Sequence, residues 1–279
     1  MHLKKIMLYL VGITVFKHPP SFLLFFPRYP TGTHQVSSQK LNFFLEQVFM
    51  LGKALGNNGH ILMKTSCSSF FYNSQVNNLQ GWLEVPEECE GMVAHYMNHG
   101  QYDVDADGVV TAMADYLSDV VPQGDGMDVV IFDIDETALS NLPYYQRHRY
   151  GCERFVHAIF SEWVEEGIAP VIASVLRLYK ELQAGKWGVI LMTGRTERQR
   201  NITTQNLLAA GYDSWTSLIL RSPEDEGTTA AAYKIKKRSE LQEKGYRIWA
   251  SLGDQWSDLT GPAAGNRTFK LPNPMYFIA

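Results

Sequence analysis

The chain has 279 residues, of which 45% are hydrophobic and 19% are charged, so a sizeable core can form and wholesale disorder is excluded. The net charge of −4 and the single dense basic run, YKIKKR, disfavour nucleic acid as the main partner. Three cysteines without C-x-x-C spacing exclude a disulfide-rich scaffold and disfavour a zinc ribbon or a thioredoxin-like site. One disulfide with one free thiol, and three reduced thiols, both stay open.

The first 60 residues are irregular in composition, and we interpret residues 1–60 as an N-terminal extension. MHLKKIMLYLVGITVF has a basic start and an apolar run of signal-peptide length, but no small-x-small cleavage site follows it. The apolar runs are too short and too interrupted to predict a stable membrane span. The extension is therefore a candidate targeting segment.

Residues 61–127 are predicted to form a helical segment with two main helices. VPEECEGMVAHYMNHG has a helical rhythm that ends at Gly100, and DGVVTAMADYLSDVV carries an apolar helical stripe. Between them, DVDADG resembles the start of an EF-hand calcium loop, with Gly108 in the sixth position counted from Asp103. The twelfth position holds Ala114, where a bidentate Glu is needed. We therefore predict a polar turn with an aspartate helix cap and not a calcium site.

From Asp128 onward, apolar strands alternate with helices, which predicts a doubly wound α/β domain over residues 128–279 with a parallel sheet covered on both faces. The predicted strands are MDVVIFDI, WGVILMT, SLILR, YRIWASLGD and RTFKLP. The helices between them end at Gly185, Gly211 and Gly245, which we predict to be left-handed C-caps. Right-handed crossovers bring the carboxyl ends of all the strands to one edge, where ligands bind in such folds.

Polar residues are concentrated at this carboxyl edge. Ionised carboxylates repel one another when they are buried together. A divalent cation between Asp133 and Asp254 would offset that repulsion, and a set of oxygen ligands favours Mg²⁺. Carboxylates, a metal, a hydroxyl donor and a lysine together suit the transfer of a phosphoryl group. The polar residues predicted at this edge are Asp133, Asp135, Thr193, Gly194, Arg195, Lys234, Asp254 and Asp258.

The spacing of Asp133 and Asp135 predicts that the two carboxylates have different chemical roles. In extended backbone, residues two apart point to the same side. One carboxylate can therefore attack phosphorus while the other acts as acid and then base at the ester oxygen.

Each of these residues also has an ordinary structural interpretation. Asp133 or Asp258 alone is typical of a helix N-cap, Thr193 of a turn at the end of a strand, and Lys234 of a solvated helix. Arg195 could contact substrate or form a structural ion pair. Taken jointly and in this order, however, the residues favour a site. Surface, packing or core roles are predicted for His148, His157, Trp163, Trp187 and Trp249.

The same residues carry a resemblance to a known family. DIDET, LMTGR, Lys234 and GDQWSD resemble, in order, the four motifs of the haloacid dehalogenase (HAD) superfamily of phosphatases. NNLQGW, VPEEC, FDIDETALSNLPYY, AGYDSW and KLPNPMYFIA are similar to plant acid phosphatases grouped with class B (subfamily IIIB) acid phosphatases and vegetative storage proteins. The similarity runs from about Cys67 to Ala279. It implies a HAD-like, Rossmannoid fold with a small helical cap at about residues 142–170.

The resemblance also implies roles for individual residues. Asp133 would be the nucleophile and Asp135 the general acid and base, while Thr193, Gly194 and Lys234 would bind the phosphoryl group.

For the metal, the resemblance implies that Asp133, the main-chain carbonyl of Asp135, and Asp254 bind Mg²⁺. Asp258 would support this metal site.

The activity implied is that of an acid phosphatase acting on small-molecule phosphate monoesters through an aspartyl-phosphate. A storage-type protein with little catalysis and a phosphotransferase to alcohol acceptors are the alternatives, and a homodimer stays open. The resemblance further implies a secreted or vacuolar location and a Cys67–Cys89 disulfide. The sequons at Asn201 and Asn266 would be glycosylated only in a secreted chain.

Overall fold

The computed structural model describes residues 58–278, with side chains described from Ser66 onward. The predicted N-terminal extension lies outside the described residues, except that its last three residues begin a helix. Within residues 58–278, no helix is both long enough and apolar enough to traverse a bilayer.

Five parallel strands form one sheet in the order β3-β2-β1-β4-β5, which confirms the predicted doubly wound α/β fold. β1 lies at the centre and every one of its residues is buried, as expected for a strand covered on both faces. The strands are β1 (Asp128–Phe132), β2 (Gly188–Thr196), β3 (Ser217–Arg221), β4 (Arg247–Gly253) and β5 (Arg267–Lys270).

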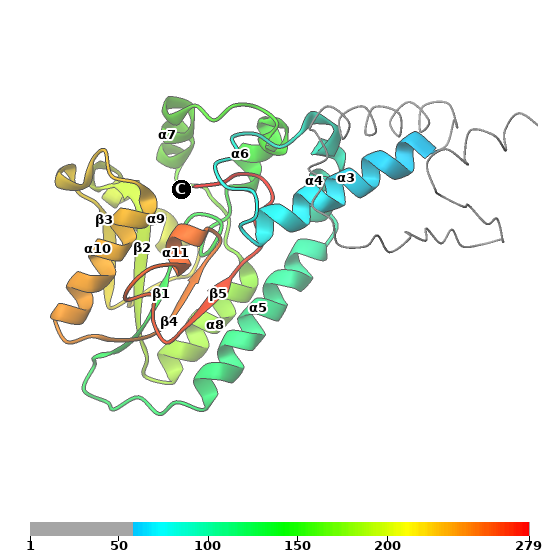
Figure 1. Cartoon of the computed structure of the whole chain (residues 1–279). Coiled ribbons are helices and arrows are strands. Elements are labelled where there is room, and N and C mark those ends of the chain that lie inside the picture. The colour runs from blue at the N-terminus through cyan, green and yellow to red at the C-terminus, as the bar shows by residue number, and fades with distance from the viewer. Residues whose placement is uncertain (1–57, 279) are drawn as a thin grey trace, which may run out of the picture. The chain divides into compact units, whose positions relative to one another are not determined.

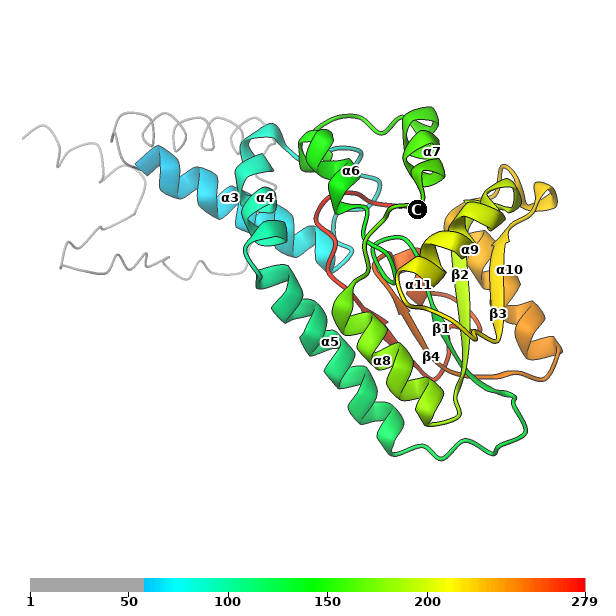
Figure 2. The ribbon, with the colours of Figure 1, turned by 180° about the vertical axis from the view of Figure 1, so that it is seen from behind.

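The helices are divided between the two faces of the sheet. Val130 and Phe132 of β1 belong to a large core that also contains buried residues of α4, α5, α8 and α9. Val129 and Ile131 point the other way, into a smaller core with Leu241 of α10. α5 and α8 lie side by side in both views (Figures 1 and 2). The helices are α3 (Asn58–Gln75), α4 (Glu90–Asn98), α5 (Gln101–Ser118), α6 (Leu142–Arg147), α7 (His157–Glu166), α8 (Ala173–Ala184), α9 (Arg200–Ala209), α10 (Ala230–Glu243) and α11 (Trp256–Leu259).

The predicted polar turn at Asp103–Gly108 is wrong, because these residues lie inside α5. The break between α4 and α5 comes earlier, at Gly100, which adopts a left-handed conformation with φ 85°. Tyr102 and Ala106 are buried at a spacing of four residues, so the apolar stripe of α5 begins before the acidic residues. The carboxylates occupy the outer face of a helix.

Two of the three predicted glycine C-caps are left-handed, and one is not. Gly211 and Gly245 have φ of 96° and 92°. Gly185 instead has φ −76°, and the next residue, Lys186, takes the left-handed conformation with φ 63°. The turn after α8 is therefore displaced by one residue, onto a lysine.

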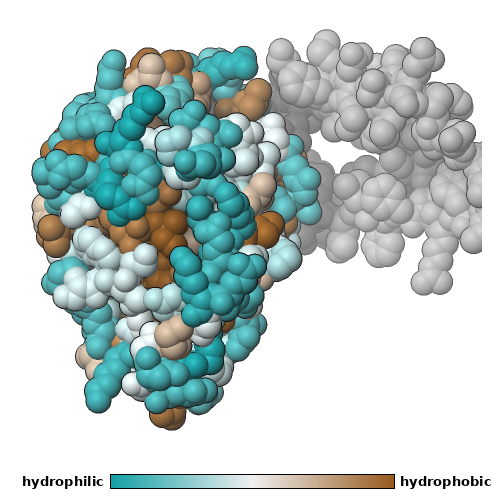
Figure 3. Space-filling model, turned by 90° about the vertical axis from the view of Figure 1, so that its left-hand side faces the viewer, coloured by the Kyte–Doolittle hydropathy of each residue, from teal (hydrophilic) through white to brown (hydrophobic). Residues whose placement is uncertain are grey.

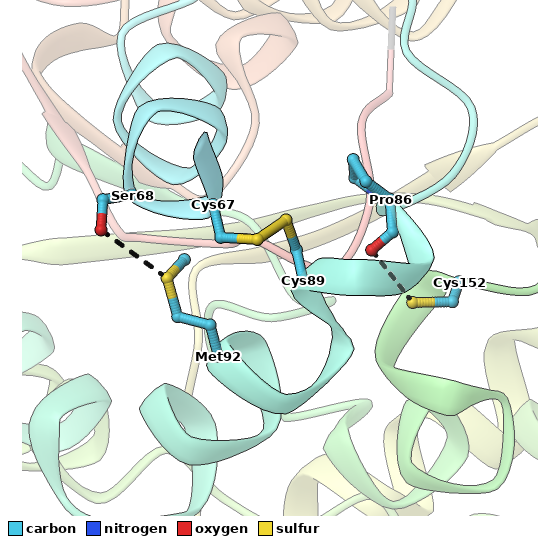
Figure 4. Close-up of a disulfide and its surroundings, with 6 residues drawn as sticks. All are labelled: Cys67, Ser68, Pro86, Cys89, Met92 and Cys152. Carbon is cyan, nitrogen blue, oxygen red and sulfur yellow. Dashed lines mark hydrogen bonds between the residues drawn. A yellow bond between two sulfur atoms is a disulfide. The ribbon is translucent and has the colours of Figure 1, made fainter. Parts of the chain in front are cut away.

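A disulfide joins Cys67 of α3 to Cys89, which ends a short 3-10 turn (Glu87–Cys89) before α4 (Figure 4). This is the pairing that the resemblance implied. Cys152 is free and buried, and its thiol donates to the carbonyl oxygen of Pro86. The disulfide ties α3 to the rest of the domain.

The C-terminal segment, Leu271–Ile278, runs back over the carboxyl edge of the sheet. Leu271 N donates to Gly253 O at 2.9 Å, and Ile278 N donates to Gln255 Oε1 at 2.8 Å. The described end of this segment lies close to α7 in both views (Figures 1 and 2). The segment therefore contributes to whatever site this edge forms.

Gly151, in the turn between α6 and α7, closely approaches the C-terminal segment, and it gives a stability prediction. Its φ is +92°, and a Cβ there would overlap the carbonyl oxygen of Met275. Gly151→Ala should lower the free energy of unfolding by about 3 kcal/mol, from a left-handed alanine plus overpacking, measured by urea denaturation. The control is Gly124→Ala, because Gly124 has φ +78° with nothing within 4 Å and should lose only about 1 kcal/mol. Equal losses would contradict the packing described here.

Candidate active site

The register of β1 and β4 brings the first two carboxylates together. Phe132 pairs with Leu252, and Asp133 N continues the ladder by donating to Leu252 O at 3.0 Å. Asp133 therefore lies level with Gly253, and Asp254 follows at once. The two carboxylates are buried, with relative exposures of 6% and 1%.

Gly253 allows a third carboxylate to approach. A Cβ at this position would collide with the side chain of Asp258. Asp258 lies in α11, where its Oδ2 accepts from Gln255 N at 3.0 Å. Carboxylate oxygens of Asp133, Asp254 and Asp258 all lie within 4.8 Å of one another.

Lys234 is the cation built into this cluster. Thr229 caps α10 by accepting from Ala232 N at 3.2 Å, and the second turn of the helix carries Lys234. Its Nζ lies 2.5 Å from Asp133 Oδ1 and also donates to Asp258 Oδ1. Burial alone would lower the pKa of Lys234, but the charges of Asp133 and Asp258 outweigh burial and raise it. The ammonium therefore stays charged.

Among the described residues, Lys234 is the cation paired with these carboxylates, and the charge of Lys270 acts on Asp254 without forming an ion pair with it. Burial, followed by the charge of Asp258, raises the pKa of Asp133 well above its usual range even though Lys234 opposes the shift. The same two causes raise the pKa of Asp254 to about 6. Positive charge is missing from the cluster.

The carboxylate oxygens that accept no hydrogen bond indicate where a cation could bind. Within the described part of the chain, Asp254 Oδ1 is buried without a hydrogen-bond partner, while its Oδ2 accepts from Gln255 and Asn273, each at 2.6 Å. The Oδ2 of Asp133 likewise accepts no hydrogen bond from the described residues. Both oxygens of Asp258 are already engaged by Lys234 and Gln255. A cluster of buried oxygens with excess negative charge fits a hard divalent cation.

Asp135 lies beside this cluster in a different environment. Arg195 Nη2 pairs with Asp135 Oδ1 at 2.8 Å, Asn141 donates to the same oxygen at 3.0 Å, and Thr193 Oγ1 donates to Oδ2 at 3.1 Å. Burial would raise the pKa of Asp135, but the charge and hydrogen bonds of Arg195, with those of Asn141 and Thr193, lower it overall. Of the two interpretations of Arg195, the structure supports the ion pair, although Arg195 also lines the cavity.

A cavity of about 250 Å³ opens over these residues. Hydrophobic residues gather in a hollow on the face of the molecule on the side of α7 and α10 (Figure 3). Among the predicted site residues, Thr193 and Asp258 lie behind the wall and contact residues that line it. The predicted residues that line the cavity are Asp133, Asp135, Gly194, Arg195, Lys234 and Asp254.

Several residues that line the cavity had no individual role predicted from the sequence, although the aromatic residues of the predicted cap were expected to shape the preference for the leaving group. His157 was given a surface or packing role but lines the cavity, whereas His148 bonds Glu153 at 3.0 Å. Trp163 and Trp187 are buried in the core, as predicted. The other lining residues come from the region of α6 and α7, the ends of β2 and β3, the start of α10, the turn after β4 and the C-terminal segment. They are Tyr145, Phe155, Phe160, Ser161, Thr196, Gln199, Arg221, Ala230, Gln255, Ser257, Tyr276 and Ile278. Of these, Gln255 and Ser257 lie inside the GDQWSD motif.

The chain is similar to proteins of known family. Acid phosphatase 1 of Solanum lycopersicum is 47% identical over 212 residues, covering 76% of this chain and 83% of the relative. The stem 28 kDa glycoprotein of Glycine max is 39% identical, covering 77% of this chain and 85% of the relative. Vegetative storage protein 1 of Arabidopsis thaliana is 33% identical, covering 80% of this chain and 85% of the relative.

A solved structure shares the fold. The class C acid phosphatase from Bacillus anthracis with tungstate bound superposes with a TM-score of 0.57 at 20% identity, covering 67% of this chain and 85% of that one. The profile of HAD superfamily subfamily IIIB (acid phosphatase) matches residues 53–279. The chain therefore belongs to subfamily IIIB of the HAD superfamily, a family of phosphoric monoester hydrolases of the acid phosphatase type.

Proposed function

We propose that the protein is an acid phosphatase that hydrolyses small-molecule phosphate monoesters through an aspartyl-phosphate, with Mg²⁺ as cofactor. The observation that carries this proposal is the position of Asp133. It faces the cavity with one oxygen free, while its other oxygen is held by Lys234. A carboxylate held in this way is oriented for attack on phosphorus.

In the proposed first step, Asp133 Oδ2 forms a bond to phosphorus as the bond from phosphorus to the ester oxygen breaks. Asp135 donates its proton to that departing oxygen. In the second step, water attacks the phosphorus of the aspartyl-phosphate, Asp135 takes up the proton of the water, and phosphate leaves with Asp133 restored. Arg195 favours the ionised form of Asp135. The first step needs the protonated form and is therefore promoted by an acidic medium, whereas the second step needs the ionised form, which Arg195 already stabilises.

The neighbouring residues would neutralise charge during both steps. Lys234 would bind a phosphoryl oxygen while keeping its contact to Asp133. Thr193 would donate to another phosphoryl oxygen only after its hydroxyl turns away from Asp135 Oδ2, to which it donates from behind the wall. Asp133, the main-chain carbonyl of Asp135, and Asp254 would hold Mg²⁺, with Asp258 supporting through Lys234. When bound, the metal would neutralise negative charge on the phosphoryl group.

Two alternatives remain relevant. Relatives named as vegetative storage proteins favour a scaffold with little catalysis, and the presence of Asp133 argues against that alternative. Transfer of the phosphoryl group to an alcohol acceptor is distinguished by comparing free phosphate with phosphorylated glycerol when glycerol is added.

We also propose a secreted or vacuolar location. The Cys67–Cys89 disulfide suits an oxidising compartment, and the sequon residues Asn201 and Asn266 are both exposed. Relatives named as stem glycoproteins agree with this proposal.

Asp133→Asn tests the nucleophile. An amide does not form the aspartyl-phosphate, so release of 4-nitrophenol from 4-nitrophenyl phosphate should fall by at least about 10³-fold. The control is Asp213→Asn, an exposed carboxylate paired with Lys180, which should keep full activity. Circular dichroism checks that both variants fold, and a folded Asp133→Asn variant with retained turnover would overturn the proposal.

Asn273→Ala tests the metal site. Asn273 holds Asp254 Oδ2 and leaves Oδ1 free, so its loss should raise the Mg²⁺ concentration for half-maximal activity by about 10- to 100-fold. Direct Mn²⁺ binding, followed by electron paramagnetic resonance, should weaken in parallel, and chelation should silence the wild type until Mg²⁺ is returned. The exposed Asn266 supplies the control, Asn266→Ala, which should match the wild type. An unchanged Mn²⁺ affinity in Asn273→Ala would argue against Asp254 as a ligand.

A further inference from the structure

The cavity is larger than a phosphate group needs, and its outer part has two kinds of wall. One wall is apolar and is formed by the cap and the C-terminal segment. The other comes from the ends of β2 and β3 and is polar, with Thr196, Gln199 and Arg221. A leaving group would contact both walls. The apolar wall consists of Tyr145, Phe155, Phe160, Tyr276 and Ile278.

Arg221 is the last residue of β3, and it is held firmly on one side. Its Nη1 donates to Asp225 O at 3.0 Å and to Thr228 O at 2.9 Å. Its guanidinium lies 4.5 Å from the centre of the Tyr233 ring. These contacts fix the guanidinium without supplying a negative charge.

The charges in the cavity single out Arg221. Among the described residues, three lysine or arginine side chains line the cavity, and two of them, Lys234 and Arg195, are paired with Asp133 and Asp135. Within the described part of the chain, no carboxylate forms an ion pair with Arg221.

Asp225 contacts Arg221, but only through its main-chain carbonyl. Its carboxylate oxygens pair with Lys236 at 2.7 Å and Lys237 at 3.2 Å. Arg221 thus presents an uncompensated positive charge to the substrate cavity.

We propose that Arg221 forms a subsite for a second anionic group, so that the preferred substrates are phosphate monoesters whose alcohol carries a carboxylate or another phosphate. The inference rests on the proposed phosphatase function and names its substrate class. The Nε and Nη2 donors of Arg221 have no partner among the described residues, and that edge of a guanidinium matches two oxygens of an anion. An arginine that only braces the turn at residues 225–228 would not need to line the cavity.

The wild-type enzyme gives the first test. Its kcat/KM for carboxyphenyl phosphate is compared with that for carbamoylphenyl phosphate, which has the same shape without the charge, using the meta and para isomers of each. At least one carboxylate isomer should be preferred by about 10-fold or more, and this preference should shrink in high salt. Equal kcat/KM values for all isomers would overturn the subsite alone. If no ester is hydrolysed, the proposed function fails, and the subsite fails with it.

Two variants locate the preference. Arg221→Gln removes the charge, so the ratio of the two kcat/KM values should fall to about one. The control is Arg198→Gln, because Arg198 is an exposed arginine that does not line the cavity and its loss should preserve the ratio. Arg221→Lys keeps the positive charge but loses the two N–H donors on one edge of the guanidinium. Its ratio of kcat/KM values should therefore lie between those of the wild type and Arg221→Gln. Thermal melting checks that each variant folds. If Arg221→Gln does not fold, the kcat/KM ratios of the wild type and of Arg221→Lys test the proposal. A preference that survives in Arg221→Gln would assign it to another residue.

Discussion

The contact between Lys234 and two buried carboxylates is the interaction on which the rest of this structure depends. It exists because β1 and β4 run parallel in a register that places Asp133 level with Gly253. In this position Asp133 is buried beside other carboxylates. Burial and the neighbouring negative charges both raise its pKa, which favours the neutral form. The ammonium of Lys234 only partly offsets the charge of these carboxylates. The proposed Mg²⁺ would neutralise the remaining negative charge, and an anionic phosphate could then approach the same edge of the sheet.

The two aspartates at the end of β1 differ because different helices and strands supply their partners. Asp133 meets an ammonium and other carboxylates, whereas Asp135 meets a guanidinium, an amide and a hydroxyl. Environments that drive two pKa values apart are typical of sites that divide nucleophile and acid–base roles. Asp254 adds a third environment, in which Asn273 of the C-terminal segment fixes one oxygen. Distant parts of the chain therefore converge on one edge of the sheet.

Much of this could be predicted from the sequence, since hydrophobic alternation is a local property. Runs such as DVVIF and RIWASLG specify strands, and parallel topology then dictates which polar residues meet. Interactions that depend on tertiary packing could not be predicted from the sequence. Asp103–Gly108 were predicted as a turn because their composition is polar, but burial of Tyr102 and Ala106 extends the helix through them. The roles of Asn273 and Arg221 depend on how a tail and a strand end fold back, which no spacing encodes.

Gly253 has a consequence for how this scaffold can change over time. Any larger residue there collides with Asp258, so Gly253 cannot be replaced while the side chain of Asp258 is present. The side chain permitted at position 253 therefore depends on the residue at position 258. A double substitution that first shortens Asp258 would be needed before Gly253 could be replaced by a larger residue.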